Sequence, residues 1–420
     1  MQIENILPLK PLQTSMAYNY FLNPESRINA EMLVYKIDGK PDVKRMAESC
    51  ALTTYNKVMK SIFYWKNTNQ PLQIIVANQT LYLEKVYAQC VSEELAKIWN
   101  MKIDITQKPY RVFLIENNAN LYLVIRTNHI LLDGWSQTIW VKKFMELYDH
   151  LEQPEPQCIK RIDYVSYIKM YWNRAIENRE YWLNAFHGYA DSQRVKSRKS
   201  CTKSQKVFVY QSRHLKKNLN RIARTNELTV SQCIYAIWAI YLIKTKNSTD
   251  ITFNIVSSGR DNYAIDAPNI VGMLMNVIPA RLKINLSWSI RQHLMYIRQK
   301  SIEMIEHQEI DTIDLFGTLE NGYKINIDTC IDIQNHPISS LKTVANHQFS
   351  LSLAEHRFHT NIPLTLAVRF DDPTVEIEFS YDDGLFHTRG IQRMIESIES
   401  IAECLYDSEK ILADLIMGVE

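Results

Sequence analysis

Hydrophobic positions along the chain follow two periods, one typical of strands and one typical of helices. In the first half, this pattern predicts strands at residues 72–77, 110–116 and 121–127 and helices at residues 142–151 and 164–185. In the second half, it predicts strands at residues 207–211, 251–256 and 375–381 and helices at residues 229–245 and 388–405. Strand-like and helical stretches therefore alternate in both halves of the chain.

The most apolar run covers residues 233–243. A helix needs about 20 such residues to cross a bilayer core, so this run predicts a helix buried on most of its faces instead. The N-terminus has no basic region followed by an apolar stretch, and we therefore expect no secretory signal.

With 420 residues, the chain is long enough for two domains, each with its own core. The predicted join is the polar segment 191–206 or the long helix before it, which gives domains at 1–175 and 176–420. Residues 194–206 hold six basic residues and no acid: Arg194, Lys196, Arg198, Lys199, Lys203 and Lys206. This segment is either a solvated loop or a docking surface for an acidic partner.

Composition narrows the class of protein. Apolar residues make up 46% and charged residues 22%, the balance of a soluble globular protein. The net charge of +2 predicts no general attraction to nucleic acid or to an anionic membrane. The seven cysteines form no CxxC pair, so we expect no zinc site, no disulfide framework and reduced thiols in a cytoplasm.

Residues 128–136 read Asn-His-Ile-Leu-Leu-Asp-Gly-Trp-Ser and carry the candidate chemistry. Three aliphatic residues separate His129 from Asp133, a predicted strand precedes them, and a helical pattern follows. A titratable side chain at a strand end, braced by a buried acid, indicates a catalytic site. Histidine is also the side chain best suited to proton transfer near neutral pH.

This nonapeptide resembles the HHxxxDG signature of the condensation domains of nonribosomal peptide synthetases, which share a fold with chloramphenicol acetyltransferase. Other stretches resemble that family's motifs in the family's order, over nearly the whole chain. They are the opening Pro-Leu-x-Pro-x-Gln segment at 7–16, the DY and YW landmarks at 163–167 and 179–182, the Gly-Arg strand at 251–260, the VGxFxNxxP motif at 271–279, the HQ and QN elements at 306–309 and 331–335, and the closing FSYD…LF stretch at 379–386.

The resemblance implies an α/β fold of two chloramphenicol-acetyltransferase-like lobes, arranged as a V-shaped pseudo-dimer with a central tunnel that reaches His129 from two opposite faces. The implied reaction is attack of an amine on an acyl or aminoacyl thioester, which forms an amide bond in nonribosomal peptide biosynthesis. The thioester would be carried on the phosphopantetheine arm of a donor carrier protein, and the acceptor would be free or carrier-bound. No tightly bound cofactor and no metal are implied.

The chain is expected to be a free-standing or excised condensation domain, with carriers and adenylation modules supplied in trans. Two alternatives stay open. One is an acyltransferase of the same fold that uses acyl-CoA or an alcohol acceptor. The other is a non-catalytic recruitment domain, which the presence of His129 argues against.

By the resemblance, His129 matches the catalytic second histidine of the signature, whereas Asn128 stands where the family has its first histidine. Asparagine also donates and accepts hydrogen bonds, so Asn128 is expected to support the site. His129 could accept a proton from the amine, orient the amine, or donate a hydrogen bond to the oxyanion. A free α-amine has a pKa of about 7.7–8.0, so part of it is already neutral at pH 7.

Asp133 is expected to brace the turn, and the resemblance suggests Arg260 as its partner across the two halves. Gly134 would allow either close approach of the pantetheine arm or a positive φ. Trp135 and Ser136 open the predicted helix and belong to the predicted tunnel, and Ser136 is expected to be an N-cap and not a nucleophile.

Asn276 and Asn335 match motif positions of the second half. Each is expected either to line the tunnel or to satisfy backbone groups. His356 and His359 are spaced three apart, but no carboxylate or cysteine in the sequence completes a metal set, so we expect this pair to lie at the surface.

Overall fold

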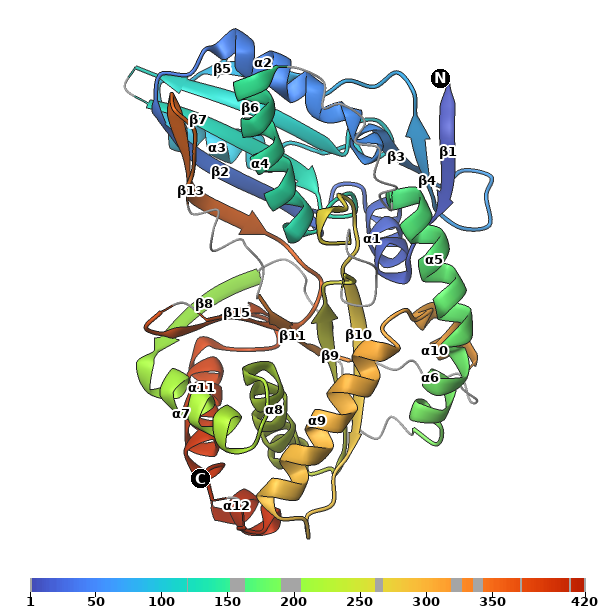
Figure 1. Cartoon of the computed structure of the whole chain (residues 1–420), viewed down its shortest axis with the longest axis vertical. Helices are drawn as coiled ribbons and strands as arrows, with labels where there is room; N and C mark the ends of the chain where they lie inside the picture. The colour runs from blue at the N-terminus through green and yellow to red at the C-terminus, as the bar shows by residue number, and fades with distance from the viewer. Residues whose placement is uncertain are drawn as a thin grey trace. The chain divides into compact units, whose positions relative to one another are not determined.

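The computed structural model describes residues 2–118, 120–151, 163–189, 205–260, 267–318, 327–334, 343–370, 372–407 and 409–418. The chain forms two compact units (Figure 1). Unit 1 comprises Met1–Asn173, Tyr263–Met275 and His336–Asn361, and unit 2 comprises Arg174–Asn262, Asn276–Asn335 and Ile362–Glu420. A single boundary at residue 175 therefore leaves out two segments of the later sequence that belong to unit 1.

Unit 1 contains a six-stranded mixed sheet in the order β12-β13-β2-β7-β6-β5. These strands are β12 (Thr343–Ala345), β13 (Phe349–Phe358), β2 (Ala30–Gly39), β7 (Asn120–Asn128), β6 (Tyr110–Asn117) and β5 (Leu83–Tyr87). Only the β5–β6 pair within it is parallel. A smaller sheet joins β1 (Ile3–Pro8), β4 (Leu72–Val76) and β3 (Ser61–Tyr64).

The helices of unit 1 are α1 (Pro11–Leu22), α2 (Val43–Leu52), α3 (Val91–Asn100) and α4 (Gly134–His150), with short 3₁₀ turns at Thr53–Tyr55, Lys57–Lys60 and Ala267–Asn269. Helix α5 (Tyr164–Glu177) begins in unit 1 and runs past the change of unit after Asn173. Helix α4 begins earlier than the predicted residue 142 because the Asp133 side chain caps it.

Unit 2 contains a second six-stranded mixed sheet in the order β10-β9-β11-β14-β15-β8. Its strands are β10 (Asn276–Lys283), β9 (Asp250–Ser257), β11 (Thr329–Ile333), β14 (Leu364–Arg369), β15 (Val375–Asp382) and β8 (Gln205–Ser212). Its helices are α6 (Arg179–Phe186), α7 (Arg213–Thr225), α8 (Val230–Lys246), α9 (Ile290–Glu306), α10 (Thr312–Thr318), α11 (Thr388–Cys404) and α12 (Leu412–Gly418).

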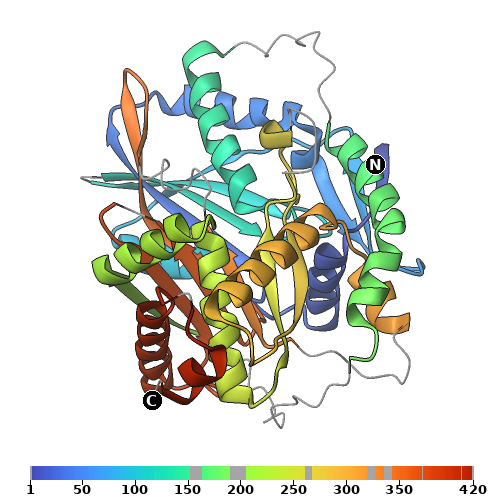
Figure 2. The ribbon, with the colours of Figure 1, turned by 60° about the horizontal axis from the view of Figure 1, so that its bottom comes forward.

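Helix α8 forms the centre of the core of unit 2. Helices α7, α8, α9 and α11 lie on one face of the sheet, and Figure 2 views them from that side. All residues of the apolar run except Tyr241 are buried, which confirms the predicted buried helix. Among the described residues, no single helix is long and apolar enough to cross a membrane, although α7 and α8 meet that test jointly as a pair bent by 106°.

The two units repeat one arrangement of four strands. In unit 1, β5 runs parallel to β6, and β6, β7 and β2 follow antiparallel. In unit 2, β11 runs parallel to β14, and β14, β15 and β8 follow antiparallel. In each unit the third strand of this set leads through a short turn into a helix of 17 residues, α4 or α11.

Most of the elements predicted from the hydrophobic pattern are confirmed within one or two residues. The predicted strands are β4, β6, β7, β8, β9 and β15, and the predicted helices of the second half are α8 and α11. The long helix predicted over 164–185 is instead two helices, α5 and α6, which meet at Asn178. The side chain of Asn178 donates to the backbone carbonyl of Glu309 at 3.1 Å.

Candidate active site

The backbone that carries His129 is held from both sides. Strand β7 ends at Asn128, whose amide donates to the carbonyl of Pro109 at 3.0 Å. The amide of His129 donates to the carbonyl of Asn29 at 2.8 Å, just before β2. His129 is buried, and these contacts with the flanking chain fix the position of its Cα.

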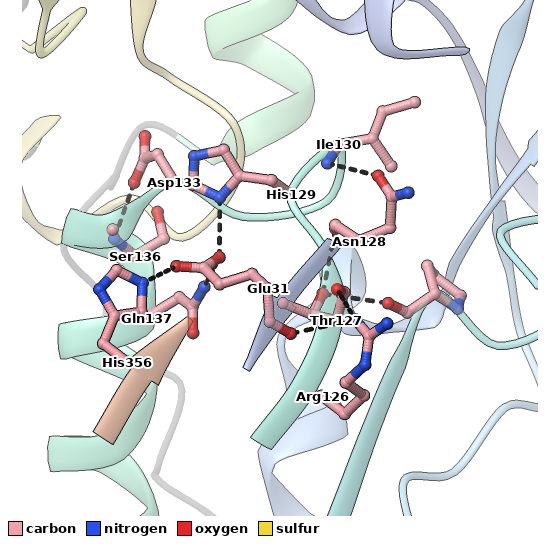
Figure 3. A network of polar contacts seen from close by, with 12 residues as sticks. Glu31, Arg126, Thr127, Asn128, His129, Ile130, Asp133, Ser136, Gln137 and His356 are labelled. Carbon is pink, nitrogen blue, oxygen red and sulfur yellow. Dashed lines mark hydrogen bonds and ion pairs between the residues drawn. The ribbon is translucent and has the colours of Figure 1, made fainter. Parts of the chain in front are cut away.

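Asn128 shapes the turn after β7. Its side-chain Oδ1 accepts a hydrogen bond from the amide of Ile130 at 3.1 Å (Figure 3). This is the bond of an Asx-turn, which short polar side chains form with the amide two residues later. Asn128 is buried, so it satisfies a backbone donor that water does not reach.

Glu31 contacts the imidazole of His129. Glu31 lies on β2, opposite Thr127 of β7, and its Oε2 is 2.8 Å from His129 Nδ1 (Figure 3). The same oxygen accepts from Gln137 Nε2 on α4, and Oε1 is 3.0 Å from His356 Nε2 on β13. Three elements therefore converge on one buried carboxylate.

Burial alone would raise the pKa of Glu31, because an ionised carboxyl group loses its hydration there. The charges and hydrogen bonds of His129 and His356 outweigh burial, and the pKa of Glu31 lies well below its usual range. The ring of Phe358, also on β13, lies 4.8 Å from the ring of His129, measured between centroids. The candidate catalytic imidazole thus contacts both a carboxylate and an aromatic ring.

Asp133 holds two pieces of backbone with its two carboxylate oxygens. Oδ1 accepts from the amide of Ser136 at 2.7 Å and caps α4. Oδ2 accepts from the amides of Leu274 at 2.9 Å and Met275 at 3.1 Å. Asp133 therefore ties the turn after His129 to the segment at 271–275, the start of the predicted VGxFxNxxP motif.

The hydroxyl of Ser136 strengthens the same tie. It donates to the carbonyl of Gly272 at 2.7 Å and accepts from the amide of Gly272 at 3.0 Å. The prediction that Ser136 is the N-cap is wrong, because Asp133 occupies that position and Ser136 lies inside the first turn of α4. Trp135 donates through Nε1 to the carbonyl of Pro268 at 2.9 Å.

The two glycines near the turn have different roles. Gly134 is the first residue of α4 and has no positive φ, so that alternative is wrong for it. Gly272 has a φ of 155°, and a Cβ atom built on it would lie 2.2 Å from Cδ2 of Tyr164. At Gly272 the ring of Tyr164 on α5 thus occupies the space that any other side chain would need.

The opening segment of the chain also reaches this motif. Lys10 is fully buried and donates through Nζ to the carbonyls of Leu274 at 2.6 Å and Met275 at 3.0 Å. Gln13 donates to the carbonyl of Ile130 at 3.0 Å. Residues that the resemblance takes from three separate motifs therefore lie together in unit 1.

The site residues predicted in the later sequence are placed less completely. Arg260 is buried in unit 2 and donates to the carbonyl of Ser258 at 2.9 Å, and its pairing with Asp133 stays a prediction. Asn276 is buried and donates to the carbonyl of Gln308 at 3.3 Å, which agrees with its backbone-satisfying alternative. Asn335 lies outside the described residues, as do residues 194–204 of the basic segment.

The histidine pair at 356 and 359 differs from the prediction in one respect. The side chain of His356 is 40% exposed, yet it contacts the buried carboxylate of Glu31. Glu31 lies more than 300 residues earlier in the chain, so the sequence around His356 gives no sign of this carboxylate partner. Burial lowers the pKa of His359. In the part of the chain that the structure describes, no group of three or more histidine, cysteine or acidic residues could hold a metal ion.

Glu31 contacts the candidate catalytic histidine and Gln137 contacts Glu31, but neither residue was predicted from the sequence. One signal was present for Glu31, which is the only charged residue in the run Ala-Glu-Met-Leu-Val-Tyr at 30–35. All six of these residues are buried, and a buried acid requires a partner. Gln137 carries no comparable signal, because a glutamine inside a helix is ordinary.

Comparison with known proteins identifies a family. The model of the family described as "Condensation domain" matches residues 3–414. Surfactin synthase subunit 3 of Bacillus subtilis (strain 168) is 23% identical over 415 residues, which cover 94% of this chain and 32% of that protein. Tyrocidine synthase 2 of Brevibacillus parabrevis is 22% identical over 428 residues, which cover 96% of this chain and 12% of that protein. The chain thus spans less than a third of the length of either relative.

Solved structures share the fold at low sequence identity. A condensation domain from a monacolin K polyketide synthase has a TM-score of 0.79 and 15% identity, over 98% of this chain and 100% of that one. A four-domain nonribosomal peptide synthetase bound to AMP and glycine has a TM-score of 0.82 and 14% identity, over 98% of this chain and 34% of that one. The two-lobed mixed α/β fold is therefore that of condensation domains.

Proposed function

Because the chain belongs to the condensation domain family, we propose that it forms an amide bond between an acyl or aminoacyl group and an amine. The donor is a thioester on the phosphopantetheine arm of a carrier protein, and the product enters nonribosomal peptide biosynthesis. Two relatives are named surfactin synthase and tyrocidine synthase, and a solved structure of the same fold is titled a nonribosomal peptide synthetase, which supports this class of reaction. In this proposal the partners are carrier proteins and adenylation modules, and no tightly bound cofactor takes part.

The observation that carries the proposal is the turn after β7, which holds a buried histidine on a backbone fixed from both sides. In the reaction, the amine nitrogen attacks the thioester carbonyl carbon, and a C–N bond forms. The tetrahedral intermediate then breaks its C–S bond and releases the pantetheine thiol. His129 is the proposed catalytic residue, which takes a proton from the attacking nitrogen and returns it to the departing sulfur.

Asp133 is a positioning residue in this proposal. Both of its carboxylate oxygens accept hydrogen bonds from backbone amides, which indicates a structural role. We keep Arg260 as a proposed partner of Asp133. Trp135 remains proposed to line the path to His129.

The experiment uses a carrier protein loaded with a panel of aminoacyl and fatty acyl thioesters, together with a panel of amines. Intact-mass spectrometry follows the loss of the acyl group from the carrier and the appearance of the amide. We expect amide formation by the wild-type chain and its loss in His129→Ala.

Two results would contradict the proposal. Turnover of acyl-CoA donors with no turnover of carrier-bound donors would favour the CoA-dependent alternative. Product formation that is equal in wild type and His129→Ala would favour the recruitment alternative.

A further inference from the structure

The carboxylate of Glu31 is oriented by contacts from three elements. Oε2 faces His129 Nδ1 and Gln137 Nε2, and Oε1 faces His356 Nε2. Because each oxygen has its own partners, the carboxylate cannot rotate without breaking contacts in a site where Glu31 is only 4% exposed. Figure 3 shows all three side chains pointing at it.

The surroundings of Glu31 favour its ionised form. His129 and His356 lower its pKa against the effect of burial. Burial raises the pKa of Tyr35 and of Tyr110, and the charge of Glu31 adds a smaller contribution, so both phenols stay neutral. Arg126 also acts on this region, since its guanidinium donates to the backbone carbonyl of Glu31 at 3.2 Å. The carboxylate therefore remains an acceptor for imidazole N–H groups at neutral pH.

We propose that Glu31 is a positioning residue for His129, which donates its Nδ1–H to Glu31 and exchanges protons with the substrate through Nε2. This inference rests on the proposed function and adds a residue to it. It also chooses among the three roles that the sequence left open for His129. An imidazole whose Nδ1–H points at a carboxylate is arranged as a base, since the carboxylate stabilises the imidazolium that forms.

Gln137 and His356 complete this arrangement. Gln137 Nε2 donates to the same oxygen as His129 and holds Oε2 toward the ring. His356 Nε2 contacts the other carboxylate oxygen, Oε1, and Phe358 packs against the ring of His129. During the attack, the proton leaves the amine for Nε2 while Nδ1–H stays with Glu31, so no proton has to pass through the carboxylate.

The first test is Glu31→Gln, which keeps the shape of the side chain and removes its charge. We expect the rate at saturating substrate to fall on the order of 10²- to 10⁴-fold, the range that general acid–base catalysis contributes. We expect KM to change little, because Glu31 does not touch the substrate. The titration of the amine is the same for both proteins, so it cancels in the ratio of their rates. The acidic limb of the pH–rate profile should lie at lower pH in Glu31→Gln than in wild type.

The matched control is Lys206→Gln in unit 2. Lys206 on β8 pairs with Tyr381 of β15, and Glu31 on β2 pairs with Thr127 of β7. Each partner is the last residue but one of its strand, so Lys206 and Glu31 occupy equivalent positions in the two sheets. Lys206 forms an ion pair at 3.2 Å with Asp383 in the turn after β15, so its replacement also removes a contact between a strand and the turn beside it. We expect this variant to keep the wild-type rate at saturating carrier protein and the wild-type pH profile, because docking by the basic segment 194–206 would change only KM.

A second test reads the tautomer directly and requires no turnover. In protein labelled with ¹⁵N-histidine, the His129 signals are identified by their loss in His129→Ala. At a pH where the ring is neutral, we expect the proton on Nδ1 in wild type and loss of that preference in Glu31→Gln. A neutral His129 with its proton on Nε2 in wild type would overturn the inference, even if Glu31→Gln failed to fold.

The experiments distinguish a failure of the proposed function from a failure of the role of Glu31. If wild type forms no amide with any donor, the proposed function is wrong, and the tautomer measurement still tests the pairing. If wild type forms amide and Glu31→Gln is equally fast, only the role of Glu31 is wrong. Recovery of part of the rate in Glu31→Asp, which restores the charge, would support positioning by a carboxylate.

Discussion

The turn after β7 in unit 1 and the turn after β15 in unit 2 have the same construction. Five residues lie between strand and helix in both, 129–133 before α4 and 383–387 before α11. The last strand residue bonds to the amide two positions later in both, Asn128 to Ile130 and Asp382 to Gly384. The next residue pairs across the sheet in both, His129 with Glu31 and Asp383 with Lys206.

Burial separates the two turns. The side chains of His129 and Glu31 are 9% and 5% exposed, whereas those of Lys206 and Asp383 are 53% and 29% exposed. The difference follows from the sheets, because β8 is an edge strand while β13 lies beside β2. Strand β13 brings His356 and Phe358 to the pair in unit 1.

The strand, turn and helix are therefore a scaffold that both units share. Water screens the exposed ion pair of unit 2, so that pair contributes little. The buried pair of unit 1 lies where charge interactions are stronger, and it includes the one side chain suited to proton transfer near pH 7. The candidate active site therefore requires, in addition to the turn, a histidine and a neighbouring strand that covers it.

The helix caps give the largest expected difference in stability. Asp133 accepts three backbone amides, whereas the N-cap of α11, His387, forms no side-chain capping bond. We expect Asp133→Ala to lower the free energy of unfolding by about 3 kcal/mol or more, from the lost cap and two buried amides without an acceptor. We expect His387→Ala to change it by less than about 0.5 kcal/mol.

Chemical denaturation of both variants measures this difference, with amide formation as a second readout. Asp133→Ala is expected to lose activity because its turn is displaced. An Asp133→Ala protein with native stability and no activity would count against the bracing role.

The glycines next to each turn give the second difference. Gly272 packs against the Tyr164 ring, so we expect Gly272→Ala to destabilise unit 1 by about 1–3 kcal/mol through overpacking. A Cβ atom on Gly390 of α11 would meet no atom within 4 Å. We expect Gly390→Ala to stabilise the chain by about 0.5–1 kcal/mol, since alanine favours a helix. Equal unfolding midpoints for the two variants would show that the Tyr164 ring does not approach Gly272 closely.

The Asx-turns give the smallest difference. Asn128→Ala leaves the buried amide of Ile130 without its acceptor, and we expect a loss of about 1–2 kcal/mol. Asp382→Ala is expected to cost less, because Gly384 is exposed and water can replace the lost bond. Thermal unfolding compares the two variants, and a larger loss of stability in Asp382→Ala would mean that burial does not decide the cost.

Asn128→His, which restores the family signature, is expected to remain active.

Much of the fold could be predicted from the sequence, because its signals are local. The period of apolar residues located β7, α8, β15 and α11, and the spacing of His129 and Asp133 located the turn. The break between α5 and α6 was not predicted, since both helices continue the same apolar period.

The partners of the predicted residues were harder to find. Asp133 was correctly expected to need a partner, but the structure adds the amides of Leu274 and Met275, which carry no side-chain signal. Glu31 and His356 meet only because β13 pairs with β2 across some 300 residues of sequence. Long-range strand pairing of this kind leaves no pattern in the neighbourhood of either residue.

The most direct test of the central claim is a single-turnover measurement of amide formation from a carrier-bound thioester. It compares wild type with His129→Ala in unit 1 and Asp383→Ala at the equivalent position of unit 2. We predict that His129→Ala slows the reaction on the order of 10²- to 10⁴-fold and that Asp383→Ala leaves it unchanged. A wild-type rate in His129→Ala, or an equal loss in both variants, would contradict the claim that the buried turn of unit 1 is the active site.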